Sequence, residues 1–207
     1  MDGTTAQRLI YSGYSKVATK IGQNYAIYRF TGLINPIVAG NLIMTIPVTF
    51  AAEHKFVRNV KALNPVRICY ADGRLLKPRD VLVGPYGTFF IGDMQPSLPI
   101  QIVRTNDVVS INRVGYTTAG SIKPITTPIA AGIPAHLQLK RIIVKAPTYG
   151  PKDTGTGVAE WLVYLPIPQG TLKQHDMLTT QDGMVYEIDA AEFSEIGYIV
   201  SARQAQA

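Results

Sequence analysis

Residues 4–22 place apolar side chains three or four positions apart, as the buried face of an amphipathic helix does. These side chains are Leu9, Ile10, Tyr14, Val17, Ala18 and Ile21. Gly22 follows the last of them, and glycine commonly ends helices. The pattern predicts one N-terminal amphipathic helix, and no second segment shows this spacing convincingly.

Most of the remaining chain consists of short apolar or alternating segments bounded by Gly, Pro, Asn or Asp, which is typical of β-strands. Strands are expected at 25–31, 56–60, 66–70, 81–83, 88–92, 99–104, 108–113, 137–145, 160–166, 185–188 and 197–202. This rhythm predicts a mainly β fold made of short-stranded β-barrel or sandwich modules, with one N-terminal amphipathic helix and long extended arms.

The expected strands suggest a division of the chain into four parts, packed as one or two compact β domains. The parts are 1–55 (helix and extended arm), 56–114 (first β-module), 115–157 (long loops with a connecting strand) and 158–207 (second β-module). The connections 115–133 and 148–157 show no hydrophobic pattern. Loops of this length are usually functional or ordered by a partner.

No charged residue lies between Arg29 and Glu53, so residues 30–52 form an uncharged segment long enough to be considered as a membrane span. Its helix-breaking or polar residues include Asn35, Pro36, Asn41 and Pro47. Such residues interrupt a helix or cost free energy in hydrocarbon, so no membrane span is expected. We interpret the uncharged segment as an arm that packs on protein, most simply on another subunit.

The sequence resembles itself at an offset of 96 residues. LKPRDVLVGPYGTFF at 76–90 aligns without a gap on LKQHDMLTTQDGMVY at 172–186, with five identities and with Phe90 opposite Tyr186. Each copy reads as strand, turn, strand. An Asp at the start of a strand can bond its own backbone in an Asx-turn, and a turn glycine supplies positive φ. The similarity is consistent with a duplicated β-module or with two unrelated hairpins.

Charge is distributed unevenly along the chain. Residues 1–150 carry 17 basic and 6 acidic side chains, a net charge of +11, whereas residues 151–207 carry 3 and 8, a net charge of −5. These charges either form ordinary solvated faces or bring unlike faces of neighbouring molecules together head to tail.

The residues that usually carry chemistry do not form a recognisable site in the sequence. His54, His136 and His175 lack metal-ligand spacing, and Cys69 sits among alternating apolar residues, as a buried thiol does. A single cysteine forms no intramolecular disulfide. GPKDTGTG at 150–157 lacks the Lys-Ser or Lys-Thr of a phosphate-binding loop. We expect no catalytic residues, no metal and no cofactor.

The sequence around the first hairpin resembles a known class of proteins. DVLVG at 80–84, TFFIGDMQPSLPIQIVRTN at 88–106 and the G-x-x-Y return at 183–186 resemble virion proteins of tailed bacteriophages, of the neck or tail class. LKQHDMLTTQDGMVYEID, which begins at Leu172, is also similar to the small β-barrel of head-closure or stopper proteins. No catalytic or binding residue transfers from these families.

This resemblance implies a non-enzymatic virion protein, assembled in the host bacterial cytoplasm, that forms a cyclic homo-oligomer at the neck. Its partners would be portal, adaptor or tail proteins. The resemblance also allows non-specific contact between this protein and DNA in a channel. A tail, baseplate or fibre-attachment protein is the first alternative. The residues expected to make assembly contacts are Arg29, Asn35, Pro36, Asn41, Pro47, Lys140, Arg141, Asp189, Glu192 and Glu195.

A third alternative is a sequence-tolerant nucleic-acid-binding β-barrel. Tyr25, Tyr28 and Phe30 lie next to Arg29 and would form a stacking face for bases.

Overall fold

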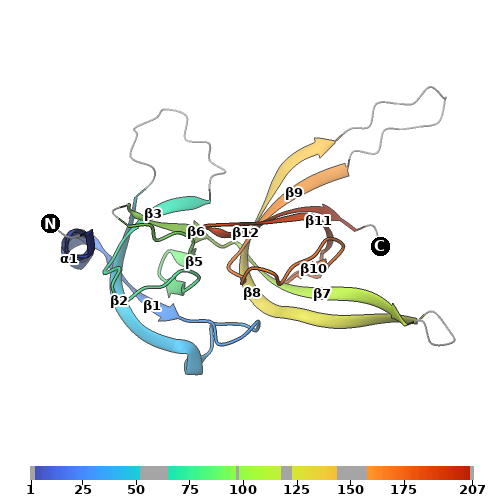
Figure 1. Ribbon diagram of the computed structural model, residues 1–207, viewed down its shortest axis with the longest axis horizontal. Coiled ribbons are helices and arrows are strands. Elements are labelled where there is room, and N and C mark those ends of the chain that lie inside the picture. The colour runs from blue at the N-terminus through green and yellow to red at the C-terminus, as the bar shows by residue number, and fades with distance from the viewer. Residues whose placement is uncertain (1–2, 52–64, 97, 118–122, 144–157, 206–207) are drawn as a thin grey trace.

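The chain folds into two closed six-stranded β-barrels that lie side by side, with one helix against the outer side of the first (Figure 1). The structure is a computed structural model and describes residues 3–51, 65–96, 98–117, 123–143 and 158–205. The mainly β fold and the single N-terminal helix are confirmed. Helix α1 (Gly3–Ile21) covers almost the expected range.

The first barrel is built from six antiparallel strands in the order β1-β2-β3-β6-β5-β4. These strands are β1 (Gln23–Tyr28), β2 (Leu42–Ala51), β3 (Val66–Tyr70), β4 (Val81–Gly84), β5 (Gly87–Ile91) and β6 (Ile100–Arg104). A short 3₁₀ turn, η1 (Ala39–Asn41), leads into β2.

The second barrel has the same strand order, β7-β8-β9-β12-β11-β10. Its strands are β7 (Asp107–Thr117), β8 (Lys123–Ile143), β9 (Val158–Leu165), β10 (Met177–Thr180), β11 (Val185–Ser194) and β12 (Gly197–Gln204). The shared order across all twelve strands supports duplication of a β-module over a chance likeness between two hairpins.

The strand pairing corrects the expected division of the chain. Residues 23–51 belong to the first barrel, because β1 pairs with β2 and β4, and residues 107–143 belong to the second, because β7 pairs with β8 and β10. Strand β2 was not expected, since its outward positions are uncharged and hide the alternation of a half-buried strand. The expected strand at 56–60 and the connection at 148–157 lie outside the described residues.

Helix α1 packs on β2 and β3 of the first barrel through buried Tyr11 and Ala18. Gly22 ends it as expected, and the structure shows why glycine is needed there. The Gly22 N–H donates to the Ala18 carbonyl at 2.7 Å, and a Cβ on Gly22 would lie 2.8 Å from the Val48 carbonyl oxygen. The chain therefore turns from helix to strand where there is no room for a side chain.

The two barrels are joined by an apolar cluster between them. Val81, Phe90 and Val103 are buried on the outside of the first barrel, where they pack with Tyr164 and Ile196 of the second. The adjoining backbone is equally close, because a Cβ on Gly92 would lie 2.1 Å from the Ile196 side chain. Apolar burial of this kind fixes the two barrels against each other.

The structure also corrects the gapless alignment of the two hairpins by one residue. Leu82 pairs with Phe89 and Leu178 pairs with Tyr186, so Phe89, and not Phe90, is equivalent to Tyr186. The β4–β5 turn has two residues between the paired Gly84 and Gly87. The β10–β11 turn has three residues, 181–183, between Thr180 and Met184, whose backbone groups are hydrogen-bonded, and Gly183 has φ 82°. A glycine with positive φ is typical of three-residue hairpin loops.

The strongest common feature of the two barrels is a buried carboxylate that forms an ion pair with an arginine. Arg29 donates to both carboxylate oxygens of Asp80 at 2.8 and 2.7 Å, and Arg113 does the same to Asp176 at 2.7 and 2.8 Å. Each aspartate side chain is only 1% exposed. The carboxylate raises the pKa of each arginine above its ordinary value through these hydrogen bonds.

Each aspartate also fixes the turn that precedes it. Asp80 accepts from the Lys77 N–H, and Asp176 from the Lys173 N–H, both at 2.8 Å. In place of the expected Asx-turn, each aspartate side chain accepts a hydrogen bond from the backbone N–H three positions earlier. The residue before each aspartate, Arg79 or His175, has a positive φ near 70°, a conformation that costs most L-residues about 1–2 kcal/mol.

We expect Arg29→Met and Arg113→Met each to lower the free energy of unfolding by about 3 kcal/mol, since either change leaves a buried carboxylate without its partner. This is the low end of the range for a broken buried pair, because both guanidiniums retain some contact with water. Urea denaturation followed by circular dichroism measures the loss. Arg74→Met breaks a more exposed pair with Asp72 and is the matched control, expected to change little. Equal losses in all three variants would contradict the prediction.

Candidate interaction surfaces

The uncharged segment does not extend from the molecule as an arm. Its first part docks on the second barrel of the same chain, where the Ala131 N–H donates to the Leu33 carbonyl at 2.9 Å and Ile34 forms a parallel bridge with Ala131. Phe30 and Leu33 pack against the second-barrel core. Residues 42–51 are strand β2. The segment is apolar because it contacts protein on one side, as predicted, but that protein is its own chain.

The same segment also presents four large apolar side chains to solvent. These are Ile34, Val38, Leu42 and Ile43, between 42% and 60% exposed, and we call them the exposed apolar strip. No charged residue lies among them. Because the segment is anchored to both barrels, the strip is held on a fixed framework.

Most of the predicted contact residues in the first barrel are used inside the chain. Arg29 holds Asp80, and the Asn35 side chain accepts from the Ile37 N–H at 2.9 Å. Pro36 and Asn41 are buried, and Pro47 lies opposite Asn24 in the β1–β2 ladder. These residues shape the segment. The residues of the exposed strip were not among the predicted contact residues.

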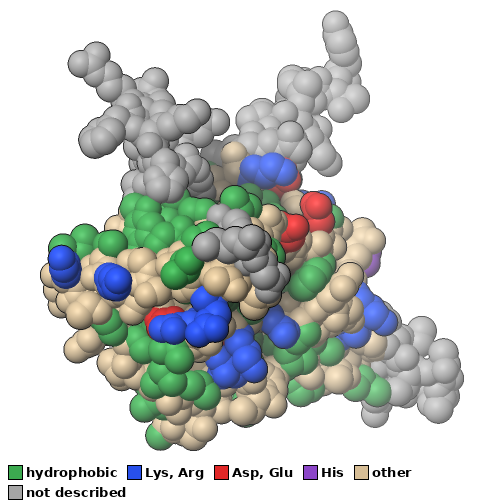
Figure 2. Space-filling model, turned by 60° about the vertical axis from the view of Figure 1, so that its left-hand side comes forward, with side chains coloured by type: hydrophobic (Ala, Val, Ile, Leu, Met, Phe, Trp, Pro, Cys, Tyr) green, Lys and Arg blue, Asp and Glu red, His purple; other side chains and the backbone are tan. Residues whose placement is uncertain are grey.

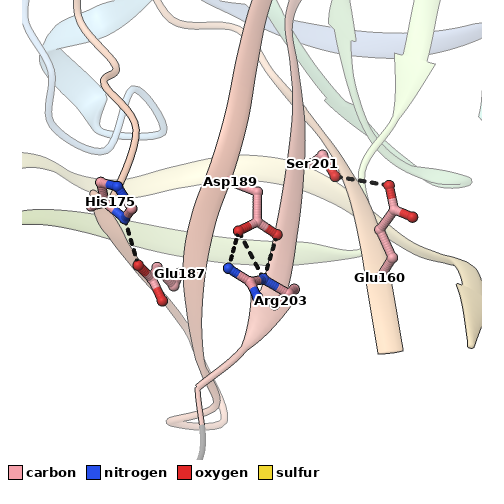
Figure 3. Close-up of polar contacts among 6 residues, drawn as sticks. All are labelled: Glu160, His175, Glu187, Asp189, Ser201 and Arg203. Carbon is pink, nitrogen blue, oxygen red and sulfur yellow. Dashed lines mark hydrogen bonds and ion pairs between the residues drawn. The ribbon is translucent and has the colours of Figure 1, made fainter. Parts of the chain in front are cut away.

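Several acidic side chains of the second barrel have polar partners within the chain (Figure 3). Arg203 donates to Asp189 at 2.8 Å, and the His175 ring contacts Glu187 at 2.7 Å. Glu195 accepts from Gln95 of the first barrel. Of the predicted acidic contacts, Glu192 alone is exposed with no partner assigned among the described residues.

Lys140, a predicted contact residue of β8, also has a partner in its own barrel. Lys140 forms an ion pair with Glu160 at 2.8 Å, and Ser201 donates to the same carboxylate at 3.0 Å. Arg141 lies opposite Glu160 in the β8–β9 ladder. These pairs weaken the expectation that unlike charged faces join molecules head to tail, because the opposite charges already meet within one molecule.

Charge is also uneven when it is counted by barrel. Residues 1–104 carry 12 basic and 5 acidic side chains, a net charge of +7, whereas residues 105–207 carry 8 and 9, a net charge of −1. On the face in Figure 2, Lys and Arg side chains gather near the middle among hydrophobic side chains, with few acidic ones beside them. The basic character therefore belongs to the first barrel.

A groove of about 710 Å³ opens at one end of the first barrel, which we call the barrel mouth. Arg67 of β3 and Arg104 of β6 both line it. Each lies two positions from a buried residue of the barrel core, Cys69 or Ile102, and therefore on the same face of its strand, so both occupy inward-facing positions at strand ends. Among the described residues that line the mouth, none carries a carboxylate.

Aromatic rings lie beneath and beside these arginines. Phe50 and Phe89 line the mouth with ring centroids 4.4 Å apart, and Tyr25 packs edge-on against Phe50 at 5.1 Å. The Tyr86 N–H donates to the Tyr25 hydroxyl at 3.2 Å, which fixes the β4–β5 turn at the rim. The Tyr86 side chain is 64% exposed. The mouth thus combines two cations with an accessible aromatic ring.

The stacking face predicted from the sequence is not available to a ligand. Tyr25 is completely buried, Phe30 packs on the second-barrel core, and Arg29 is held by Asp80. The sequence analysis did not predict the mouth. Arg67 and Arg104 could have indicated it, because each occupies a position of an alternating strand at which an apolar residue is expected.

The residues tested for chemistry lie apart from one another. Cys69 is buried, and burial raises the pKa of its thiol far above the ordinary value. His54 lies outside the described residues. In the part of the chain that the structure describes, no three His, Cys, Asp or Glu side chains are placed to hold a metal ion, and no helix is long and apolar enough to cross a membrane.

Comparison of the chain with protein-family models, with curated proteins and with solved structures gave no match.

Stability should depend on pH through His136, which is half-buried at the junction of the barrels beside Tyr164. Burial, and secondarily the charge of Arg104, lower its pKa below the ordinary 6.5. The unfolded chain then takes up the proton first, so stability is retained above about pH 6.5 and lost as the pH falls below it. Urea midpoints at several pH values should fall less steeply for His136→Phe than for the wild type. His175→Gln, at an exposed histidine, is the control and should follow the wild type.

Proposed function

We propose that this chain is a non-enzymatic structural component of a tailed-phage virion. In this proposal it is a ring-forming neck protein of the head-closure or adaptor type, assembled in the host bacterial cytoplasm. The observation that carries the assembly role is the exposed apolar strip on a segment anchored to both barrels. Large exposed apolar groups on a rigid framework are typical of protein contact surfaces. The assignment to phage rests on the resemblance of residues 80–106 and 183–186.

Anchoring matters because a contact surface that is ordered in advance loses little conformational entropy on binding. The strip lies between two fixed points: Leu33, which bonds to β8, and Ile46, which points into the first-barrel core. The apolar cluster around Phe90 holds the two barrels together. A subunit with these properties is suited to a repeating assembly, where each copy must present its contacts at the same angle.

The β7–β8 hairpin supplies a second surface at a different place. β10 pairs with β7 only as far as Asn112, and β9 pairs with β8 only from His136 onward. The hairpin therefore projects beyond the barrel (Figure 1), with Val114 and Ile125 exposed on it. A closed ring needs two different complementary surfaces on each subunit. The strip and the hairpin are candidates for these two surfaces.

The proposed partners are further copies of this chain and the neighbouring portal, adaptor or tail proteins. A tail, baseplate or fibre-attachment protein would use the same two surfaces, and remains the alternative position in the particle. The position of this chain in intact particles distinguishes the two. Antibodies against it would label the neck in the first case and the tail tip in the second, as seen in electron micrographs.

Self-association should depend on the strip. We expect Val38→Lys and Ile43→Lys each to weaken the oligomer at least about tenfold, near 1.4 kcal/mol, because a charge would then be buried in an apolar contact. Sedimentation velocity over a concentration series measures the change, and negative-stain images show whether rings form. Met184→Lys, at a similarly exposed position just after the β10–β11 turn, is the matched control. A wild-type chain that stays monomeric at its highest attainable concentration contradicts self-assembly.

A further inference from the structure

The mouth of the first barrel has the features of an anion-binding site that the assembly role does not use. Arg67 and Arg104 both face into it, and no described lining residue neutralises them. The Nε atom of Arg67 is buried and has no hydrogen-bond partner among the residues that the structure describes. A buried donor without a partner is costly, so a ligand that accepts its hydrogen bond is favoured there.

We propose that this mouth binds the backbone of single-stranded nucleic acid, with the two guanidinium groups on phosphates and the Tyr86 ring stacked on a base. Guanidinium groups bind phosphate oxygens through paired hydrogen bonds, and they carry their charge at all physiological pH values. Cationic grooves with accessible aromatic rings are the usual means of binding single strands without reading their sequence.

The exposed ring favours a nucleic acid over an acidic protein segment as the ligand. A carboxylate would satisfy the arginines but would leave Tyr86 without a flat partner. The volume of the mouth, about 710 Å³, falls within the range of sites for small organic groups. A base that stacks on Tyr86 must be unpaired, so the geometry selects single strands over duplex.

The charge of the surrounding barrel favours the same ligand. The net charge of +7 over residues 1–104 attracts a polyanion from a distance, whereas the second barrel is nearly neutral. The acidic groups closest in sequence to the mouth arginines belong to other contacts, since Asp72 is paired with Arg74 and Asp107 accepts from the Val108 and Gln181 N–H groups. The two mouth arginines are thus left to act on a ligand.

The test is fluorescence anisotropy of the full chain with a labelled oligothymidylate of about 20 nucleotides, longer than a single-barrel site, over a series of salt concentrations. Each lost phosphate contact on a single strand lowers the slope of log K against log salt by about 0.7. We expect Arg67→Ala with Arg104→Ala to lower the slope by about 1.4. Tyr86→Ala should weaken binding at least about fivefold with little change in slope, because it removes stacking and no charge.

The matched control is Arg8→Ala with Lys16→Ala, which removes the same charge from the exposed side of α1. It should leave the slope close to that of the wild type. Equal effects of the two double variants would overturn the proposal, because binding would then follow net charge alone. The exposed Arg104→Gln single variant, expected to lose about 0.7 in slope, keeps the test decisive if the loss of Arg67 disturbs folding.

Competition separates the two kinds of anion. Polyglutamate at matched charge should displace the oligonucleotide poorly, and its own binding should be indifferent to Tyr86→Ala. Displacement as strong as that by unlabelled oligothymidylate would overturn the nucleic-acid assignment in favour of an acidic protein segment. Sedimentation of the same variants without DNA shows that self-association is unchanged, so failure at the mouth is distinguished from failure of the assembly role.

Discussion

Each barrel closes around a buried carboxylate. Asp80 opens β4 and is held by Arg29 at the end of β1, so the ion pair joins the two strands whose pairing completes the ring of six. Asp176 and Arg113 do the same for β10 and β7. Burying a carboxylate without a cation costs several kcal/mol, so the turn, the closing strand pair and the arginine stabilise one another. The rest of each barrel depends on this closure.

The second constraint is the contact between the barrels, and it decides which surfaces remain for partners. Residues 30–41 leave the first barrel, lie on the second and return, while Ile196 of the second barrel packs against Gly92 of the first. Acidic groups such as Asp189 and Glu195 are paired inside this unit. The strip is apolar and the barrel mouth is cationic, so they are two chemically distinct surfaces that need not compete.

Much of the secondary structure was predictable because it is encoded locally. The spacing of Leu9, Tyr14 and Ala18 predicts α1, and β3 at 66–70 has the predicted bounds. The offset of 96 residues pointed to the repeated hairpin. Two elements were missed where the local pattern fails: β2, whose outward side chains are uncharged, and the start of β8, whose Pro, Thr and Gly residues look like a loop.

The sequence by itself determined which residues avoid water and where the chain turns, since spacing and turn chemistry act over a few residues. Only the tertiary structure decided what each charge meets. Arg29 and Asp80 are 51 positions apart, and Arg67 and Arg104 converge at one mouth, because barrel closure brings distant strand ends together. Contacts between residues so far apart in the sequence depend on strand order and register, which no local pattern specifies. The same closure turned the uncharged segment from an expected arm into a docked segment with an exposed strip.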